Sequence, residues 1–201
     1  MADIRFVQAD TLKEKPADVS KVGFGRVFTD YMFEMDYNPE EGWHDARIVP
    51  YQDVPLSPAN ATLHYGQAIF EGCKAYRYEG GKAVVFRAKD HIARLNRSAK
   101  ILDIPEVDEK LVYDALMKLI DLEKDWIPDG PGQSLYIRPF IFSTDPYLGV
   151  SVGQYYKMMI ILSPVGAYYA NGFAPVKIMV EDTYVRAPKG GLGAAKTPAN
   201  Y

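Results

Sequence analysis

Two helical patterns stand next to each other in the middle of this 201-residue chain, with strand patterns before and after them. Apolar residues recur every three or four positions in 90–102 and in 108–126, as one face of an amphipathic helix requires. We expect Asp90 to cap the first helix, because its carboxylate can accept the free amides of the first turn. Since strands precede and follow the helices, the chain predicts an α+β fold rather than repeating βαβ units.

Segments rich in Ile, Val, Tyr and Phe lie on both sides of the helices and are typical of β-strands. After the helices, they cover residues 134–143, 155–164 and 175–180. Before the helices, residues 22–35 and 47–54 are expected to be extended, with turn residues between them.

The strand predicted at 134–143 carries a pair of polar aromatic and basic side chains. Tyr136 and Arg138 are two positions apart, so their side chains share one face of the strand. Leu135 and Ile137 then face the core. A phenol and a cation therefore stand side by side, where one small molecule could meet both.

Charge and cysteine content exclude several classes of protein. The formal net charge is -3, which argues against nucleic acid or an anionic membrane as the main partner. The longest apolar stretch, 158–162, is far shorter than the ~20 residues of a membrane-spanning helix. Cys73 is the single cysteine, so an intramolecular disulfide is impossible and a reducing compartment fits best. We therefore expect a soluble, cytoplasmic protein.

A glycine-rich segment precedes Lys196 and allows two interpretations. A phosphate-binding P-loop needs a second glycine where this chain has Ala195, and a helix where it has Pro198. A lysine that forms a Schiff base needs close backbone approach of a flat cofactor, which glycine and alanine permit. The Schiff-base interpretation fits better, although the loop alone is also compatible with a solvated lysine.

Six short motifs occur in order along residues 23–201. They are Phe24-Gly25-x-Val27-Phe28, Leu63-His64-Tyr65 through Phe70-Glu71-Gly72, Arg94-x-x-Arg97-Ser98-Ala99, Tyr136-x-Arg138-Pro139, Gly166-Ala167-Tyr168, and Gly190-Gly191-x-Gly193-x-x-Lys196 ending in Asn200-Tyr201. Together they resemble the branched-chain amino acid aminotransferases. These are class IV aminotransferases and pyridoxal 5'-phosphate (PLP) enzymes of fold type IV.

The resemblance also implies a domain organisation. By the resemblance, residues 21–164 would be a small N-terminal domain of α/β sandwich type, 165–175 an interdomain linker, and 176–201 the start of the PLP domain. Residues 1–20 are polar and mixed in charge, and we expect them to be a leader. Family members continue beyond Tyr201, so we expect the chain to be truncated just after the lysine motif. Pro198 and Ala199 replace two glycines that the family usually has, which stiffens the loop without removing a reacting group.

The resemblance assigns roles to single residues. Lys196 would carry PLP as a Schiff base and act as the acid/base of the proton shift. Arg94 would bind the PLP phosphate, Tyr201 the phenolic oxygen, and Arg186 would approach the cofactor. Arg138 with Tyr65 would receive the side-chain carboxylate of glutamate or 2-oxoglutarate. The remaining substrate-binding residues would be an aromatic wall and a loop that reaches the neighbouring subunit of a homodimer: Phe24, Phe70, Tyr136 and Tyr168, then Leu148 and Val150.

The predicted activity transfers the α-amino group of L-leucine, L-isoleucine or L-valine to 2-oxoglutarate. Two alternatives remain open. One is a D-amino acid aminotransferase or aminodeoxychorismate lyase of the same fold. The other is a noncatalytic dimerising lobe, if the chain really ends at Tyr201. The acidic partner of the pyridine nitrogen cannot be assigned within these 201 residues, so the isolated chain is expected to be inactive.

Overall fold

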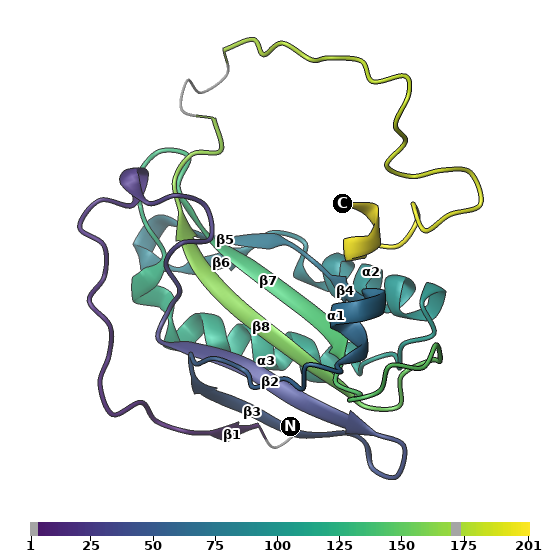
Figure 1. The fold of residues 1–201 in the computed structure, drawn as a ribbon. Helices are drawn as coiled ribbons and strands as arrows, with labels where there is room; N and C mark the ends of the chain where they lie inside the picture. Colours follow the sequence, from purple (N-terminus) through teal and green to yellow (C-terminus); the bar gives the residue numbers. More distant parts are fainter. Residues whose placement is uncertain (1–3, 170–173) are drawn as a thin grey trace.

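The structure, a computed structural model, describes residues 4–169 and 174–201 (Figure 1). The strands and α-helices are β1 (Arg5–Phe6), β2 (Tyr31–Asn38), β3 (Gly42–Pro50), α1 (Ala61–Tyr65), β4 (Ala68–Phe70), β5 (Cys73–Arg77), β6 (Ala83–Val85), α2 (Ala88–Ile101), α3 (Glu109–Leu122), β7 (Ser134–Ser143) and β8 (Tyr156–Val165). Short 3-10 turns complete them: η1 (Val19–Lys21), η2 (Glu79–Gly81), η3 (Lys124–Trp126) and η4 (Pro198–Asn200).

One eight-stranded sheet organises the chain, in the order β1-β3-β2-β8-β7-β5-β6, with β4 also paired to β7. The pairing is antiparallel except between β1 and β3. The central strands β7 and β8 are ten residues each and pair along their whole length, from Ser134 opposite Val165 to Ser143 opposite Tyr156. The strands that precede and the strands that follow the two helices in sequence belong to one largely antiparallel sheet. This confirms the α+β prediction.

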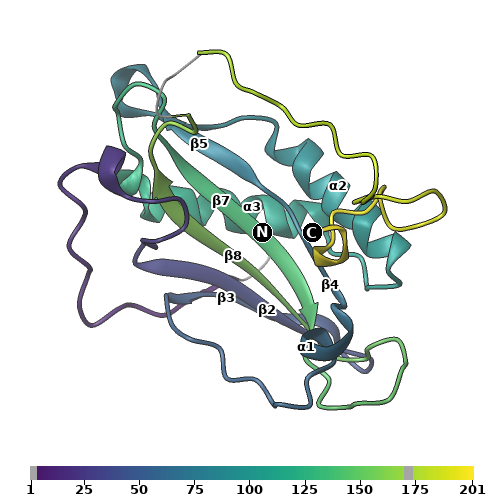
Figure 2. The same cartoon turned by 45° about the horizontal axis from the view of Figure 1, so that its top comes forward.

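Helices α2 and α3 cover one face of this sheet (Figure 2). The apolar stripes predicted at 90–102 and 108–126 are the faces they bury, and Leu95 and Leu119 have no exposed surface. In strand β7, Leu135 and Ile137 are likewise fully buried, as their alternation with Tyr136 predicts. None of the helices in the described residues is both long and apolar enough to cross a membrane.

The first helix begins differently from the sequence prediction. Helix α2 starts at Ala88, and its N-cap is Arg87, in the left-handed region at φ 54°. Asp90 is therefore inside the first turn, where its carboxylate accepts a 2.6 Å bond from Arg87 Nε instead of capping the helix. Helix α3 follows the usual rule, because the Asp108 carboxylate accepts from the amides of Lys110 and Leu111.

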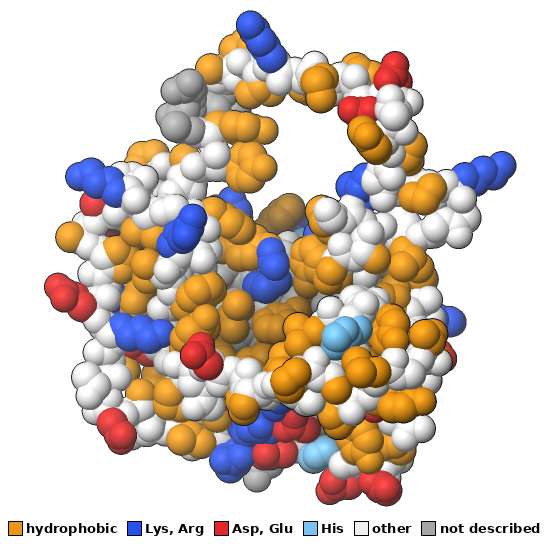
Figure 3. Space-filling model, viewed as in Figure 1, with side chains coloured by type: hydrophobic (Ala, Val, Ile, Leu, Met, Phe, Trp, Pro, Cys, Tyr) orange, Lys and Arg blue, Asp and Glu red, His pale blue; other side chains and the backbone are white. Residues whose placement is uncertain are grey.

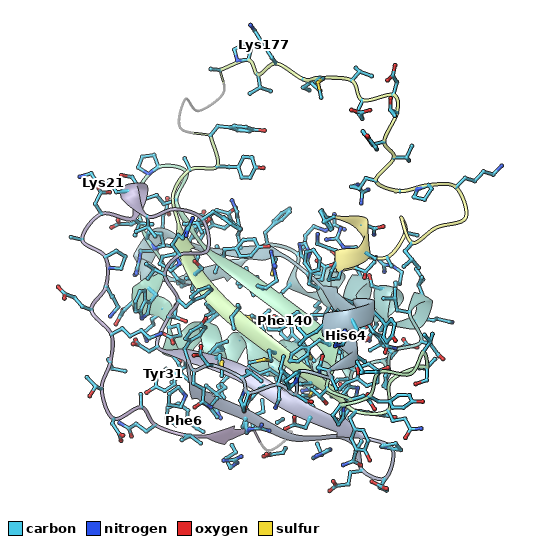
Figure 4. All side chains as sticks on the ribbon, in the orientation of Figure 1. Phe6, Lys21, Tyr31, His64, Phe140 and Lys177 are labelled. Carbon is cyan, nitrogen blue, oxygen red and sulfur yellow. The ribbon has the colours of Figure 1, made fainter. Side chains whose placement is uncertain are left out.

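The strand predicted at 175–180 is wrong, whereas 134–143 matches β7 and 155–164 matches β8 to within one residue. Residues 175–180 have no regular structure, and Ile178, Met179 and Val180 are more than 80% exposed. A strand needs a neighbour to complete its backbone hydrogen bonds, and no described strand pairs with this segment. Lys177 points outward from the long connection that these residues form (Figure 4).

Other predictions concern the first third of the chain. Of the segment predicted at 22–35, only the part from Tyr31 onward is a strand, and the segment at 47–54 is extended only to Pro50 within β3. The turn residues at 38–42 do connect β2 to β3. Residues 1–3 of the predicted leader and 170–173 of the predicted linker lie outside the described residues.

Two buried acids, Glu123 and Asp30, hold segments against the start of strand β2. Glu123 is 1% exposed, and its Oε1 accepts a 2.5 Å bond from the amide of Tyr31, at the start of β2. Neighbouring Asp30 accepts from Trp126 Nε1 at 2.7 Å and from the amide of Lys13 at 2.6 Å. Burial, with the charge of Asp30, raises the pKa of Glu123 to about 7, although the bond from Tyr31 opposes that shift.

The raised pKa of Glu123 predicts that the folded protein becomes less stable as the pH rises. The folded protein keeps a proton on Glu123 that the unfolded chain releases above its ordinary pKa of 4.5. The free energy of unfolding should therefore fall between about pH 5 and pH 8 by on the order of 2 kcal/mol more than in Glu123→Gln. Urea unfolding at several pH values measures this, with Glu40→Gln in the exposed turn as the control. Parallel pH profiles of wild type and Glu123→Gln would contradict it.

Candidate active site

The backbone around Lys196 is fastened to two elements of the core. The amide of Lys196 donates to Ser98 Oγ on α2 at 2.9 Å, and its carbonyl accepts from the amide of Phe70, at the end of β4, at 3.0 Å. The fully buried Thr197 donates from Oγ1 to the carbonyl of Ala68 at 2.8 Å. The following turn, η4, therefore lies against β4 and α2, as Figure 1 shows at the C-terminal end.

Two aromatic rings lie next to the amine of Lys196. Its Nζ lies 4.3 Å from the ring centre of Phe70 and 5.6 Å from that of Tyr201. The Tyr201 hydroxyl lies 3.4 Å from Nζ, and the guanidinium of Arg186 lies 5.6 Å from the Tyr201 ring. Three of the residues predicted to bind the cofactor, Lys196, Tyr201 and Arg186, are thus neighbours.

The glycine-rich segment bends sharply before the lysine. Gly190 has φ +78°, a conformation that side chains other than glycine rarely adopt. A Cβ at Gly193 would lie 2.7 Å from the Cβ of Ala187, so the two passes of the loop touch there. Asn200 holds the glycine-rich segment in place, because its Nδ2 donates to the carbonyls of Leu192 and Ala195. Gly193 therefore lacks room for a side chain, whereas at Gly190 the backbone conformation is the constraint.

Arg94, the predicted phosphate-binding residue, forms an ion pair with Glu71. Arg94 Nε lies 2.5 Å from Glu71 Oε1 and Nη2 lies 2.8 Å from Oε2, so the pair has two parallel bonds. His91 Nδ1 is 2.9 Å from the same Oε2. Burial raises the pKa of Glu71, but the bonds from Arg94 and His91 outweigh it and hold that pKa below its ordinary value. Glu71 is therefore a buried, ionised carboxylate.

Tyr136 and Arg138 share one face of β7, as the sequence predicts. Arg138 Nη2 donates to the Tyr136 hydroxyl at 3.0 Å, and its guanidinium lies 4.7 Å from the ring centre of Phe70. The ring of Phe24 meets that of Tyr136 edge-on at 4.9 Å. Phe70 thus contacts Arg138 as well as Lys196, and joins the predicted substrate residues to the lysine.

A groove of about 510 Å³ lies beside this aromatic cluster. Phe24, Tyr136 and Tyr168 line it together with Lys74, which is the partner of Tyr136 in strand β5. The face of the molecule below the long connection from 174 to 195 is hollowed, with hydrophobic and basic side chains around the hollow (Figure 3). Three members of the predicted aromatic wall therefore line one groove.

Tyr65, Leu148 and Val150 are not among the residues that line this groove. The Tyr65 hydroxyl, at the end of α1, donates to the carbonyl of Leu148. Val150 is 88% exposed, at the tip of the loop between β7 and β8. Among the described residues, Arg138 bonds to Tyr136 and Tyr65 bonds to this loop, and the shared binding of a substrate carboxylate stays a prediction.

Sequence reasoning missed the residues that support the site. Glu71 and Ser98 stand inside the quoted motifs, Phe70-Glu71-Gly72 and Arg97-Ser98-Ala99, but their partners lie far away in sequence. Cys73 is buried, which raises the pKa of its thiol to about 12, so this thiol is unsuited to act as a nucleophile. In the described part of the chain, no three His, Cys, Asp or Glu side chains are grouped to hold a metal ion.

Comparison with known proteins gives clear relatives, although no family model matches the chain. Branched-chain-amino-acid transaminase 1 of Bacillus subtilis is 54% identical over 190 residues, which are 94% of this chain and 53% of that protein. A probable branched-chain-amino-acid aminotransferase of Staphylococcus epidermidis is 52% identical over 199 residues, 98% of this chain and 55% of that protein. The solved branched-chain amino acid aminotransferase of T.th., complexed with N-(5'-phosphopyridoxyl)-L-glutamate, has a TM-score of 0.60 and 24% identity, covering 84% of this chain and 51% of its own.

The fold is thus that of one part of a fold type IV enzyme, as the motifs predict. By sequence, nearly the whole chain is similar to the branched-chain-amino-acid aminotransferases, which confirms the resemblance. It spans about half the length of the curated relatives it matches.

The close approach of Tyr136 to Gly72 makes a testable contact. A Cβ at Gly72 would collide with the Tyr136 hydroxyl and lie 3.0 Å from Tyr136 Cζ. Gly72→Ala should therefore displace Tyr136 and cost about 1–3 kcal/mol of unfolding free energy. In Tyr136→Phe, which lacks the hydroxyl, the same substitution should cost clearly less. Equal costs in the two backgrounds, measured by urea unfolding, would show that this contact does not exist.

The bond from Lys196 to Ser98 predicts local protection of the lysine segment. Ser98→Ala removes the acceptor of the Lys196 amide, a loss of about 1 kcal/mol for one hydrogen bond. Hydrogen exchange of that amide should become several-fold faster, by NMR or mass spectrometry. Ser163→Ala is the matched control, because the Ser163 hydroxyl is also buried but has no partner among the described residues. Unchanged exchange in Ser98→Ala would refute the attachment.

Proposed function

We propose that the protein carrying this chain is a PLP-dependent transaminase. It moves the α-amino group of L-leucine, L-isoleucine or L-valine to 2-oxoglutarate, giving the 2-oxo acids and L-glutamate. The observation that carries the proposal is the position of Lys196: its amine lies beside the rings of Phe70 and Tyr201, at the end of the motif shared with the aminotransferase family. The names of the relatives point to the same activity.

The residues present fit PLP by their chemistry. An amine can bond the aldehyde, a phenol can donate to the ring oxygen, and a guanidinium can bind the phosphate. Lys196, Tyr201 and Arg94 supply these three groups. Bonds with Glu71 raise the pKa of the Arg94 guanidinium, and Tyr201 adds to this shift, so Arg94 and Tyr201 are near each other. When bound, PLP supplies the electron sink that stabilises a carbanion at the substrate α-carbon.

Lys196 has two tasks in this reaction. It would hold the cofactor through its Nζ, and once displaced by the substrate amine it would carry a proton between the substrate α-carbon and the cofactor. Both tasks need an amine that stays at one place while its bonds change. The hydrogen bonds of the Lys196 backbone to Ser98 and Phe70 supply that fixed position.

Substrate binding falls to the aromatic cluster and Arg138. Phe24, Phe70, Tyr136 and Tyr168 would bury a branched alkyl side chain, and Arg138 would meet the carboxylate of the acidic partner substrate. The T.th. enzyme binds a phosphopyridoxyl derivative of glutamate, which supports an acidic substrate. Because Tyr65 contacts the loop of Leu148, Tyr65 would contribute to substrate binding by holding that loop in place.

The organisation of the protein is part of the proposal. Residues 1–20 form a leader, 21–164 the small domain, 165–175 a linker, and 176–201 the beginning of the PLP domain. The exposed loop with Leu148 and Val150 would reach a second subunit of a homodimer. A cytoplasmic location agrees with a single, buried cysteine.

The test of this function is the fate of Lys196 in the full-length protein. Borohydride reduction of the purified enzyme should add one phosphopyridoxyl group to Lys196, seen by intact mass and peptide mapping. Lys196→Ala should abolish leucine transamination, a loss of at least about 10³-fold, because the reaction loses its acid/base. Lys189→Ala, in the exposed part of the loop, is the control and should retain activity.

Each outcome decides between the alternatives. Near-normal turnover of leucine by Lys196→Ala would refute the function. Activity on D-alanine without activity on L-leucine would favour the D-amino acid aminotransferase. A dimer that takes up no PLP and leaves Lys196 unmodified would favour the noncatalytic lobe.

A further inference from the structure

Glu71 is the most deeply buried carboxylate next to the candidate site, and no proposed reaction step uses it. Its side chain has no exposed surface. The residue is held by its backbone, since its amide donates to the carbonyl of Pro139 on β7 at 2.7 Å. An ionised carboxylate in such a place costs considerable free energy unless every oxygen is paired.

Both oxygens of Glu71 are in fact occupied. Oε1 accepts from Arg94 Nε, and Oε2 accepts from Arg94 Nη2, from the amide of Gly72 at 3.1 Å, and lies 2.9 Å from His91 Nδ1. These bonds keep the carboxylate ionised and leave it no free position to take up a substrate proton. Glu71 is therefore unsuited to act as an acid or base, and well suited to hold another group still.

The group it holds is the guanidinium of Arg94. Two parallel bonds fix the plane of a guanidinium as well as its position, which one bond or a lysine cannot do. The two bonds use Nε and Nη2, so the Nη1 edge is outside the fork. The Arg94 side chain is 46% exposed, so the part outside the fork can meet a ligand.

We propose that Glu71 is a positioning residue, which orients Arg94 so that the remaining N–H groups of its guanidinium bind the phosphate of the cofactor. The inference rests on the proposed function. The ion pair carries little net charge, so it offers the phosphate directed donors rather than charge. A buried glutamate that only stabilised the fold would not affect how the protein distinguishes a phosphorylated ligand from an unphosphorylated one.

The experiment compares PLP with pyridoxal, which has the same ring and aldehyde but no phosphate. Dissociation constants of both are measured by absorbance titration of the cofactor-free, full-length protein, and their ratio reports phosphate recognition. Glu71→Gln keeps the size of the side chain but loses its charge. We expect the pyridoxal-to-PLP ratio of dissociation constants to fall by about tenfold or more in this variant, because the glutamine amide nitrogen cannot accept from Arg94 and the two-bond fork is lost.

The matched control is Glu34→Gln. Glu34 is also a buried glutamate paired with an arginine, since it lies 2.6 Å from Arg47 Nη2, but it stands on β2 among Asp36 and Lys157. This variant should lose stability and leave the ratio unchanged. Arg94→Lys should lower the ratio like Glu71→Gln, and adding Glu71→Gln to it should lower the ratio no further.

Several results would overturn the inference. A ratio that stays the same or rises in Glu71→Gln, while Arg94→Lys lowers it, means that Arg94 needs no orientation. If Glu71→Gln does not fold, Arg94→Lys decides, because lysine keeps the charge but cannot form the two-bond fork. An unchanged ratio there refutes the positioning role. A wild-type protein that binds PLP no better than pyridoxal refutes the proposed function itself, and this inference with it.

Discussion

The candidate site depends on the attachment of the Lys196 backbone to the core. Residues 174–195 form no helix or strand, so nothing regular carries the lysine to its place. Its amide and carbonyl are instead bonded to Ser98 of α2 and Phe70 of β4, and Thr197 adds a bond to Ala68. Three hydrogen bonds thus fix the backbone that carries the amine, relative to a sheet that the chain completed some 30 residues earlier, at Val165. The loop can vary its path, provided that it returns to these partners.

Strand β4 is only three residues long, yet the site is arranged around its end. The ring of Phe70 contacts both the amine of Lys196 and the guanidinium of Arg138, while Glu71, the next residue, bonds to Arg94. Successive side chains of an extended chain point to opposite sides, so two neighbouring residues can serve two different parts of a site. Pairing of β4 with β7 sets the position of both, because the amide of Glu71 is bonded to Pro139.

Local sequence patterns correctly predicted the elements whose pairing and packing follow from their own residues. Strand β7 matches its prediction because alternation of buried and half-buried side chains is written into residues 134–143, and the same alternation placed Tyr136 beside Arg138. The segment 175–180 has equally strand-like residues but no described neighbour to pair with, which no local pattern reveals. Asp90 is a residue type that often caps helices, but the helix begins earlier, after Arg87, whose backbone is in the left-handed region. The lysine, tyrosine and arginine of the site came from the family motifs, whereas Ser98 and Glu71 act through partners distant in sequence.

The two arginines at the centre of the proposed reaction differ in what holds them. Arg94 is paired with a buried carboxylate, which cancels most of its charge and fixes its direction. Arg138 is held by a neutral phenol and lies over an aromatic ring, so it keeps its charge. A permanent ligand such as a cofactor phosphate benefits from fixed donors, since it need not be attracted anew in each cycle.

A pocket that accepts an apolar side chain in one half-reaction and a carboxylate in the next needs a cation that keeps its charge. Its cation must attract an acid when one arrives, and the rings of Phe70 and Tyr136 can cover it when an alkyl group is bound instead.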